Sequence, residues 1–259
     1  MTIHEFGDKS KPSILLLPGT MCFWKGNFAK VIPDLSQDFH VLAVAYTGFD
    51  EKDEESYHSL PDEVIRIEAA LKKQNGGNIL AAYGCSLGGS VVCHLVRRNV
   101  IHIRYAILGS SDLDQAGRLR ARILSSLMIK LVYPFLHTGQ YSNKWMQKRY
   151  EKQMASLDPY NKAFVSLVGR DRYDMSFLSK ESLRNQFESD LTTRLEKHID
   201  NKETEIHIFY ARKMGKKYLK RYRLYFKNPI IHDFDLRHEE LLGVYPERWC
   251  SLIKEICLK

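Results

Sequence analysis

A serine set between two glycines is the residue of this 259-residue chain best suited to nucleophilic chemistry. Ser86 stands in the segment 84–88 (GCSLG), directly after the apolar run 78–83 and before a stretch with helical periodicity. In a tight turn from strand to helix, the hydroxyl projects from the end of the sheet, and the glycines allow close backbone approach. We therefore predict that Ser86 is a nucleophile. A serine that only caps the helix, or a phosphate-binding loop, is the alternative interpretation.

A serine hydroxyl is a weak nucleophile unless a base removes its proton, so a histidine is needed. Of the ten histidines, His238 in the segment 236–242 (LRHEELL) is best placed, because it follows the last predicted strand and precedes the final helix. Ser86 and His238 would then both lie at the carboxyl edge of one sheet, where open α/β folds collect their chemistry. We predict that His238 is the general base. A histidine on a surface loop is the alternative.

The tetrahedral oxygen formed in acyl transfer needs two N–H donors. Leu87 follows the serine and opens the helix, so its N–H is the first predicted donor. The second should come from the short PGTM turn after the first apolar run. We predict the N–H of Thr20, with that of Met21 as the alternative.

Three further residues are predicted to contact the substrate. Met21 and Trp24 follow the first apolar run, and Gly48 follows the second, so all three lie toward the same edge of the sheet. Trp24 would line the acyl side of the pocket and Gly48 its entrance. For Gly48, a purely structural turn is the alternative.

Short apolar runs that alternate with longer amphipathic stretches supply the strands that must position these residues. The runs span residues 13–17, 40–46, 78–83, 104–109, 204–210 and 229–234. Strands separated by helices at this rhythm indicate βαβ units. The predicted fold class is therefore α/β, a mainly parallel sheet with helices on both faces.

Residues 114–200 break the alternation, because they show helical periodicity in places and no convincing strand. We predict a core domain of residues 1–113 and 201–259, with residues 114–200 inserted as a helical cap, or lid, after the strand that ends near Gly109. The insertion is rich in methionine and aromatic residues. We therefore expect a small-molecule substrate with an apolar or aromatic acyl group. The alternative is that these side chains form the core of the cap.

Composition excludes several classes of protein. The five cysteines lack CxxC spacing, and neither a metal-binding motif nor a dinucleotide fingerprint occurs. No run is long and apolar enough to cross a membrane, and the first residues lack the features of a secretion signal. We expect a cytoplasmic protein with reduced thiols, without a metal or cofactor and without integral membrane association.

A basic run at residues 212–227 contains eight Lys and Arg, four aromatic residues and no acid, in a chain of net charge +8. Such a run can bind nucleic acid or anionic lipid. Its aromatic residues recur at helical spacing, so the simpler interpretation is a helix whose aromatics face the sheet and whose lysines face solvent. We therefore predict no nucleic-acid partner. Binding of a phosphate or carboxylate on the substrate is the alternative use of the lysines.

The order of these segments resembles the α/β-hydrolase superfamily, and within it the small bacterial serine hydrolases with a helical cap. The resemblance is carried by LLLPGTMCFW, VAYTGFD, GCSLGG, a helical insertion and RHEELL, and it covers residues 12–112 and 204–258. It implies a sheet of the α/β-hydrolase type. The roles that it implies are Ser86 as nucleophile, His238 as base, and Leu87 with Thr20 as the oxyanion hole.

The third member of a catalytic triad is not evident. After the strand at 204–210 the family has an acid, but here Met214 occupies its place, and no Asp or Glu occurs from 211 to 228. Some members of the family take this acid from the loop after the preceding strand, where Asp112 is the candidate. The alternatives are Asp114, Glu240, or a Ser86–His238 pair without an acid.

Together these residues predict a serine hydrolase that cleaves a carboxylic ester, or a thioester or amide, through an acyl-serine intermediate. The alternative is a non-catalytic ligand-binding or regulatory protein on the same scaffold. The missing acid favours that alternative, whereas the serine and histidine argue against it.

Overall fold

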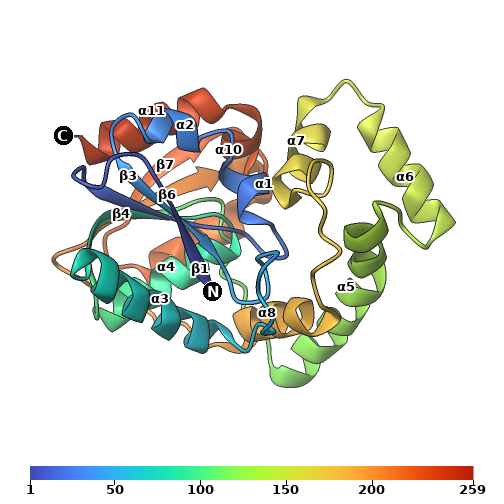
Figure 1. Ribbon diagram of the computed structural model, residues 1–259, viewed down its shortest axis with the longest axis horizontal. Helices are drawn as coiled ribbons and strands as arrows, with labels where there is room; N and C mark the ends of the chain where they lie inside the picture. The colour runs from blue at the N-terminus through green and yellow to red at the C-terminus, as the bar shows by residue number, and fades with distance from the viewer. Residues whose placement is uncertain (259) are drawn as a thin grey trace.

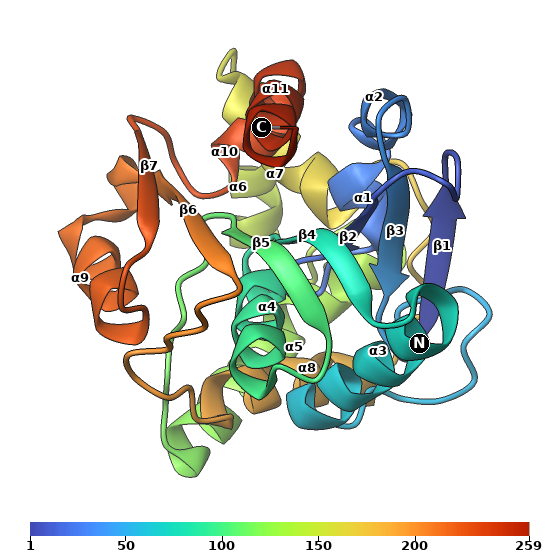
Figure 2. The same ribbon diagram turned by 90° about the vertical axis from the view of Figure 1, so that its left-hand side faces the viewer.

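Seven strands form one sheet, and six of them correspond to the apolar runs of the sequence. The computed structural model describes residues 1–258. The strands are β1 (Thr2–Phe6), β2 (Ser13–Leu17), β3 (His40–Ala45), β4 (Asn78–Gly84), β5 (His102–Leu108), β6 (Glu205–Ala211) and β7 (Ile230–Phe234). Their order is β1-β3-β2-β4-β5-β6-β7, and every neighbouring pair is parallel except β1 and β3 (Figure 2). The predicted α/β class and mainly parallel sheet are confirmed.

β1 is the strand that the apolar runs do not predict. It lies at the edge of the sheet, pairs with β3 alone and leaves its side chains exposed or half-buried. Strands buried on both faces read as continuous apolar runs, whereas a half-exposed edge strand does not. The pattern of apolar residues therefore does not predict β1.

Helices cover both faces of the sheet. Figures 1 and 2 show α3 and α4 on one face and α1, α2, α10 and α11 on the other. The bounds are α1 (Trp24–Phe28), α2 (Ile32–Leu35), α3 (Leu60–Asn75), α4 (Leu87–Arg98), α5 (Arg118–Thr138), α6 (Lys144–Met154), α7 (Pro159–Val168), α8 (Lys180–Thr192), the 3₁₀ turn η1 (Arg212–Met214), α9 (Lys216–Tyr225), α10 (Glu240–Val244) and α11 (Pro246–Cys257). α3 shows how local sequence sets such bounds, because the Ser59 hydroxyl accepts the Asp62 N–H at 3.3 Å and Gly76 ends the helix at φ 61°.

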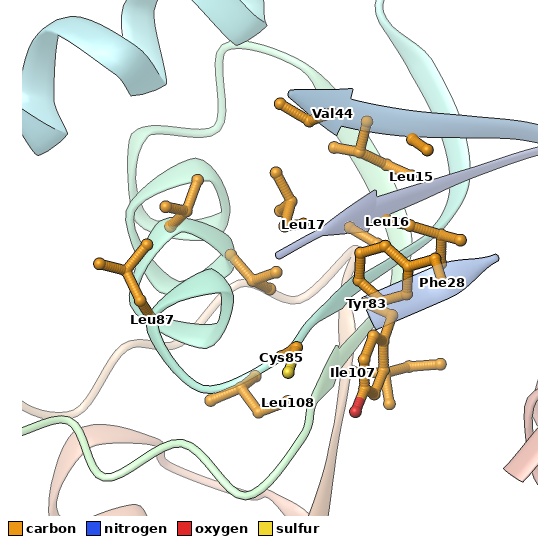
Figure 3. Close-up of a cluster of buried hydrophobic side chains, with 14 of the residues drawn as sticks. Leu15, Leu16, Leu17, Phe28, Val44, Tyr83, Cys85, Leu87, Ile107 and Leu108 are labelled. Atoms are coloured by element: carbon orange, nitrogen blue, oxygen red, sulfur yellow. The ribbon is translucent and has the colours of Figure 1, made fainter. Parts of the chain in front are cut away.

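The hydrophobic core lies where the central strands are buried on both faces. β2 and β3 are buried along their whole length. Figure 3 shows side chains of β2, β4 and β5 gathered with Phe28 of α1 close to the start of α4. Cys85, 2% exposed, belongs to this cluster. The core therefore holds both sides of the turn from which Ser86 projects.

Helices α5 to α8 follow β5 in the chain and precede β6, and we call them the insertion helices. α7 packs against α1 and α10, whereas α8 packs against α3 and α5. In Figure 1, α5 and α6 form the margin of the molecule farthest from the sheet. The division into a core of residues 1–113 and 201–259 and a cap of residues 114–200 stays a prediction. None of the helices in residues 1–258 combines the length and apolar character needed to span a membrane.

Candidate active site

Ser86 lies in a sharply bent turn between β4 and α4. Its backbone has φ 48° and ψ −110°, a conformation that residues with a side chain rarely adopt. The neighbouring glycines are needed because no side chain fits at their positions. A Cβ at Gly84 would lie 2.2 Å from the carbonyl carbon of Gly88, and a Cβ at Gly88 would lie 2.2 Å from the carbonyl oxygen of Leu17. Within residues 1–258, the Ser86 side chain forms no capping bond to α4. This argues against the interpretation of Ser86 as a helix cap.

Ser86 and His238 line one cavity of about 210 Å³ at the carboxyl ends of β2 and β4. His238 lies between β7 and α10, where the Tyr160 hydroxyl donates to its carbonyl at 3.0 Å and the Phe164 ring lies 6.5 Å from its ring. Among the described residues, no direct hydrogen bond joins the serine to the histidine. Such bonds often tighten only when substrate binds, so the shared cavity is the informative observation.

Two backbone N–H groups beside the serine are available to an oxyanion. Thr20 lines the same cavity, and Leu87 is the first residue of α4. In the described part of the chain, neither N–H donates to another group. The N–H of Met21, the alternative donor, is bonded to Oε1 of Gln186 at 2.7 Å. The geometry therefore favours Thr20 and Leu87.

Gln186 is a residue of the site that the sequence does not suggest. It lies on α8, and its side chain is fully buried. Its bond to Met21 reaches from the insertion helices to the turn after β2, where Met21 has φ 58°. Only the tertiary fold brings these residues together, 165 positions apart. Gln186 therefore helps to hold the turn that carries Thr20.

The three candidate acids differ in what they contact. Asp114 pairs with Arg221 at 2.6 Å, and Glu240 pairs with Arg237 at 3.0 Å. Asp112 has no ion pair with an arginine or lysine side chain among residues 1–258. Burial is the main cause that raises the pKa of Asp112, with the Asp114 carboxylate acting in the same direction, while His238 is among the groups that lower it.

No described acid forms a hydrogen bond with the His238 ring. Asp112 differs from the other two in having no arginine ion pair, and His238 is among the groups that lower its pKa. The role of Asp112 therefore stays a prediction, with Asp114 and Glu240 each occupied by an arginine.

A buried carboxylate behind Ser86 is the second feature that the sequence does not suggest. Glu239 is 3% exposed. Its Oε1 accepts the N–H of Ser86 at 2.9 Å and that of Ser110 at 2.8 Å, and its Oε2 accepts the hydroxyl of Tyr83 at 3.0 Å. A Cβ at Gly109 would lie 2.5 Å from Oε1, so the glycine makes room for the carboxylate. Glu239 thus ties the nucleophile turn to the loop after β5.

Strained backbone is concentrated at this site. Six non-glycine residues of the described chain have positive φ. Two of them, Ser86 and Glu239, line the cavity, and a third, Met21, lies in the turn that carries Thr20. Such conformations persist only where the surrounding structure enforces them, and they cluster at functional sites.

An apolar cavity of about 540 Å³ adjoins the one that holds the serine. Both are lined by Thr20, Phe164 and Val168. The other apolar and aromatic lining residues are Met21, Met128, Val132, Phe135, Leu136, Tyr141, Tyr150, Tyr160, Val165 and Phe187. Most of them come from the insertion helices, and Met21 is one of the predicted substrate contacts.

Trp24 and Gly48, two of the predicted substrate contacts, line neither of the two cavities. Trp24 is buried, and its ring stacks on that of His4 at 4.3 Å. Gly48 faces α8, where a Cβ would lie 2.4 Å from the Ser182 hydroxyl oxygen. Their place in the sequence indicates the correct edge of the sheet but does not fix the direction in which they face.

The basic run forms η1 and α9, and its aromatic side chains pack inward. Tyr222 and Tyr225 are buried, and the Tyr222 hydroxyl donates to the Ser111 carbonyl. This agrees with the simpler interpretation of the run. A separate polar cavity of about 740 Å³ lies at the amino ends of β5 and β6, away from Ser86. No group of three or more His, Cys, Asp or Glu within residues 1–258 is arranged to hold a metal ion.

Comparisons with known proteins agree with this architecture. A family model described as the alpha/beta hydrolase family matches residues 14–199, more than two thirds of the chain. No curated protein matched the chain in sequence.

Solved structures show the same fold over the whole chain. A Desulfitobacterium hafniense protein assigned to the α/β-hydrolase family has a TM-score of 0.77 at 20% identity, covering 98% of this chain and 99% of its own. MenH from S. aureus has a TM-score of 0.71 at 15% identity, with 98% and 97% covered. The enol-lactonase from Burkholderia xenovorans LB400 has a TM-score of 0.69 at 13% identity, with 100% and 96% covered. With the matching family model, these findings place the chain in the α/β-hydrolase family.

Proposed function

We propose that this hydrolase cleaves a carboxylic ester through an acyl intermediate on Ser86. The observation that carries the proposal is the strained turn that presents Ser86 to the cavity also lined by His238 and Thr20. A ligand-binding protein needs neither a strained serine nor a histidine beside it. An ester is preferred over an amide because its leaving group departs more easily.

The proposed reaction uses four groups of the site. The Ser86 hydroxyl attacks the ester carbonyl while His238 takes its proton. The N–H groups of Thr20 and Leu87 hold the negative oxygen of the tetrahedral intermediate. His238 then protonates the leaving alcohol and activates the water that releases the acid.

Two carboxylates support these groups in the proposal. Asp112 acts on His238 through its charge, in the place of the acid that is absent after β6. Glu239 is a positioning residue, because it contacts the Ser86 backbone and not the reacting hydroxyl. If Asp112 does not act, Ser86 and His238 work as a pair.

The substrate is proposed to be a small molecule with an apolar acyl group. The support is the adjoining cavity of about 540 Å³, whose lining is mostly apolar and aromatic. The insertion helices would then serve as the cap of residues 114–200 over a core of residues 1–113 and 201–259. A thioester with the same acyl group is the second candidate, since its carbonyl would meet the same groups.

A fluorophosphonate probe tests the proposal, because it modifies activated serines covalently. We expect labelling of the wild type on Ser86 and none in Ser86→Ala. Ser90, a buried serine of α4, supplies the control variant Ser90→Ala, in which Ser86 should still be labelled. An unlabelled but folded wild type would instead support a non-catalytic ligand-binding protein, the interpretation favoured by Met214 in the place of an acid.

A further inference from the structure

Helix α5 has two apolar faces, and only one of them is packed. Ala121, Ser125 and Ile129 are buried. On the other side, Leu119, Ile123 and Leu127 are 74%, 61% and 54% exposed. Their spacing of four residues places them on one face of the helix. An exposed apolar row of this length is unusual on a helix that has already buried one face.

Exposed cations lie on the same helix as this row. The exposed cations of α5 are Arg118, Arg120, Arg122 and Lys130. The helix contains no acid, and within residues 1–258 none of these four cations has an ion-pair partner. In contrast, Arg221 of α9 pairs with Asp114. We call these four cations together with Leu119, Ile123 and Leu127 the outer face of α5.

Helix α6 also carries an exposed aromatic residue beside a basic one. Trp145 is 66% exposed, and the Arg149 guanidinium lies 5.6 Å from the centre of its ring. Leu131, four residues beyond Leu127, lines a surface cavity of about 390 Å³ together with Trp145 and Arg149. The apolar row of α5 therefore leads to this cavity.

The surface cavity adjoins the cavities of the active site. Tyr141, Tyr150 and Gln153 line both the surface cavity and the apolar cavity of about 540 Å³. The apolar cavity in turn shares Thr20 and Phe164 with the cavity that holds Ser86. A series of adjoining cavities thus extends from the exposed apolar row to the nucleophile.

We propose that the outer face of α5, with Trp145 of α6, docks on an anionic lipid surface, and that the ester substrate enters from that surface through the adjoining cavities. Apolar side chains flanked by Arg and Lys are suited to the boundary between headgroups and acyl chains. A second copy of this chain fits less well, because a symmetric contact would bring the unpaired arginines of both copies together. The part of the inference that concerns substrate entry rests on the proposed hydrolase function.

Sedimentation with lipid vesicles tests the docking surface. The vesicles contain phosphatidylcholine alone or with phosphatidylglycerol, at low and high salt. We expect the wild type to bind the anionic vesicles and to dissociate as salt rises. Removing three charges with Arg118→Gln, Arg120→Gln and Arg122→Gln should weaken binding about 100-fold, at about five-fold per charge.

The apolar row is tested in the same assay. The combined variant Leu119→Ser, Ile123→Ser and Leu127→Ser should weaken binding at least ten-fold, because three apolar side chains no longer enter the lipid. Ile65→Ser, at another exposed apolar residue, and Lys72→Gln with Lys73→Gln should bind as the wild type does.

The result that overturns the proposal is a wild type that does not bind anionic vesicles, or binding that survives both combined variants. The proposal would also be overturned if the wild type does not bind vesicles but associates with itself, and if the combined variant Leu119→Ser, Ile123→Ser and Leu127→Ser abolishes that self-association. This result would assign the outer face of α5 to a second copy of the chain. Hydrolysis of a short water-soluble ester separates this failure from that of the proposed function. Both combined variants should keep that activity, whereas vesicle binding without any Ser86 labelling would contradict the hydrolase alone.

Discussion

Among single residues, Glu239 offers the sharpest test of how the nucleophile turn is held. Glu239→Gln keeps an oxygen for the N–H groups of Ser86 and Ser110, which share Oε1. Glu239→Ala leaves these two N–H groups and the Tyr83 hydroxyl without this acceptor, so we expect it to lower the free energy of unfolding by about 3 kcal/mol. Probe labelling of Ser86 should slow at least ten-fold in the alanine variant and much less in the glutamine variant. Equal labelling rates in wild type and Glu239→Ala would show that the carboxylate does not position the serine.

The acid that acts on His238 is tested by substituting Asp112. Asp112→Asn should lower kcat by roughly 10²- to 10⁴-fold if its charge stabilises the imidazolium. Asp114→Asn is the matched control, because Asp114 pairs with Arg221, and its kcat should stay within a few-fold of wild type. An unchanged kcat in Asp112→Asn would remove Asp112 from the site and leave a serine–histidine pair.

Ser86, His238 and Thr20 are predicted from the sequence as site residues, and all three line one cavity of the structure. Their signals are local: a glycine-flanked serine and two loops at the ends of predicted strands. Glu239 and Gln186 could not be found in this way, because their importance comes from burial and from partners 153 and 165 positions away. Nothing in the local sequence marks a glutamate as buried.

At the scale of elements, Ser90 of the nucleophile helix α4 is among the groups that lower the pKa of Asp190 on α8. Burial is the main cause that raises the pKa of Asp190 from 3.8 to about 7, with Asp112 acting in the same direction. The folded chain thus holds this proton more tightly than the unfolded chain, so stability falls as pH rises from about 4 to about 7.

Asp190→Asn removes this pH dependence, because an amide has no proton to lose. We expect the variant to be more stable than wild type at pH 8 and equal to it near pH 4, as measured by urea unfolding at both pH values. Asp174→Asn is the control, because hydrogen bonds from Ser176 lower the pKa of Asp174. Replacing this carboxylate should not increase the free energy of unfolding at pH 8. A lower stability of Asp190→Asn at pH 8 would contradict this account.

The elements themselves were predictable to different degrees. Strands buried on both faces, such as β2 and β3, follow from continuous apolar runs. β1 was not predicted, because it is a half-exposed edge strand without a continuous apolar run. The insertion was recognisable as helical, but its contact with the turn after β2 depends on tertiary packing.

At the scale of the whole molecule, the adjoining cavities predict a preference for longer acyl chains. From p-nitrophenyl acetate to octanoate, kcat/KM should rise about four-fold per methylene until the apolar cavity is full. Val132→Trp should narrow that cavity and reduce turnover of octanoate while sparing acetate. Val100→Trp, at an exposed position outside the cavity, should change neither. A preference for acetate in the wild type would contradict an apolar acyl site.

The proposed reaction depends most directly on an acyl group that is carried by Ser86. The measurement is rapid acid quenching during turnover of p-nitrophenyl acetate, followed by mass spectrometry of the peptide that contains residues 84–88. We predict an acetyl group on Ser86 in the wild type and no adduct and no turnover in Ser86→Ala. Ester hydrolysis that proceeds equally fast in Ser86→Ala, with no adduct on the wild-type peptide, would contradict the account.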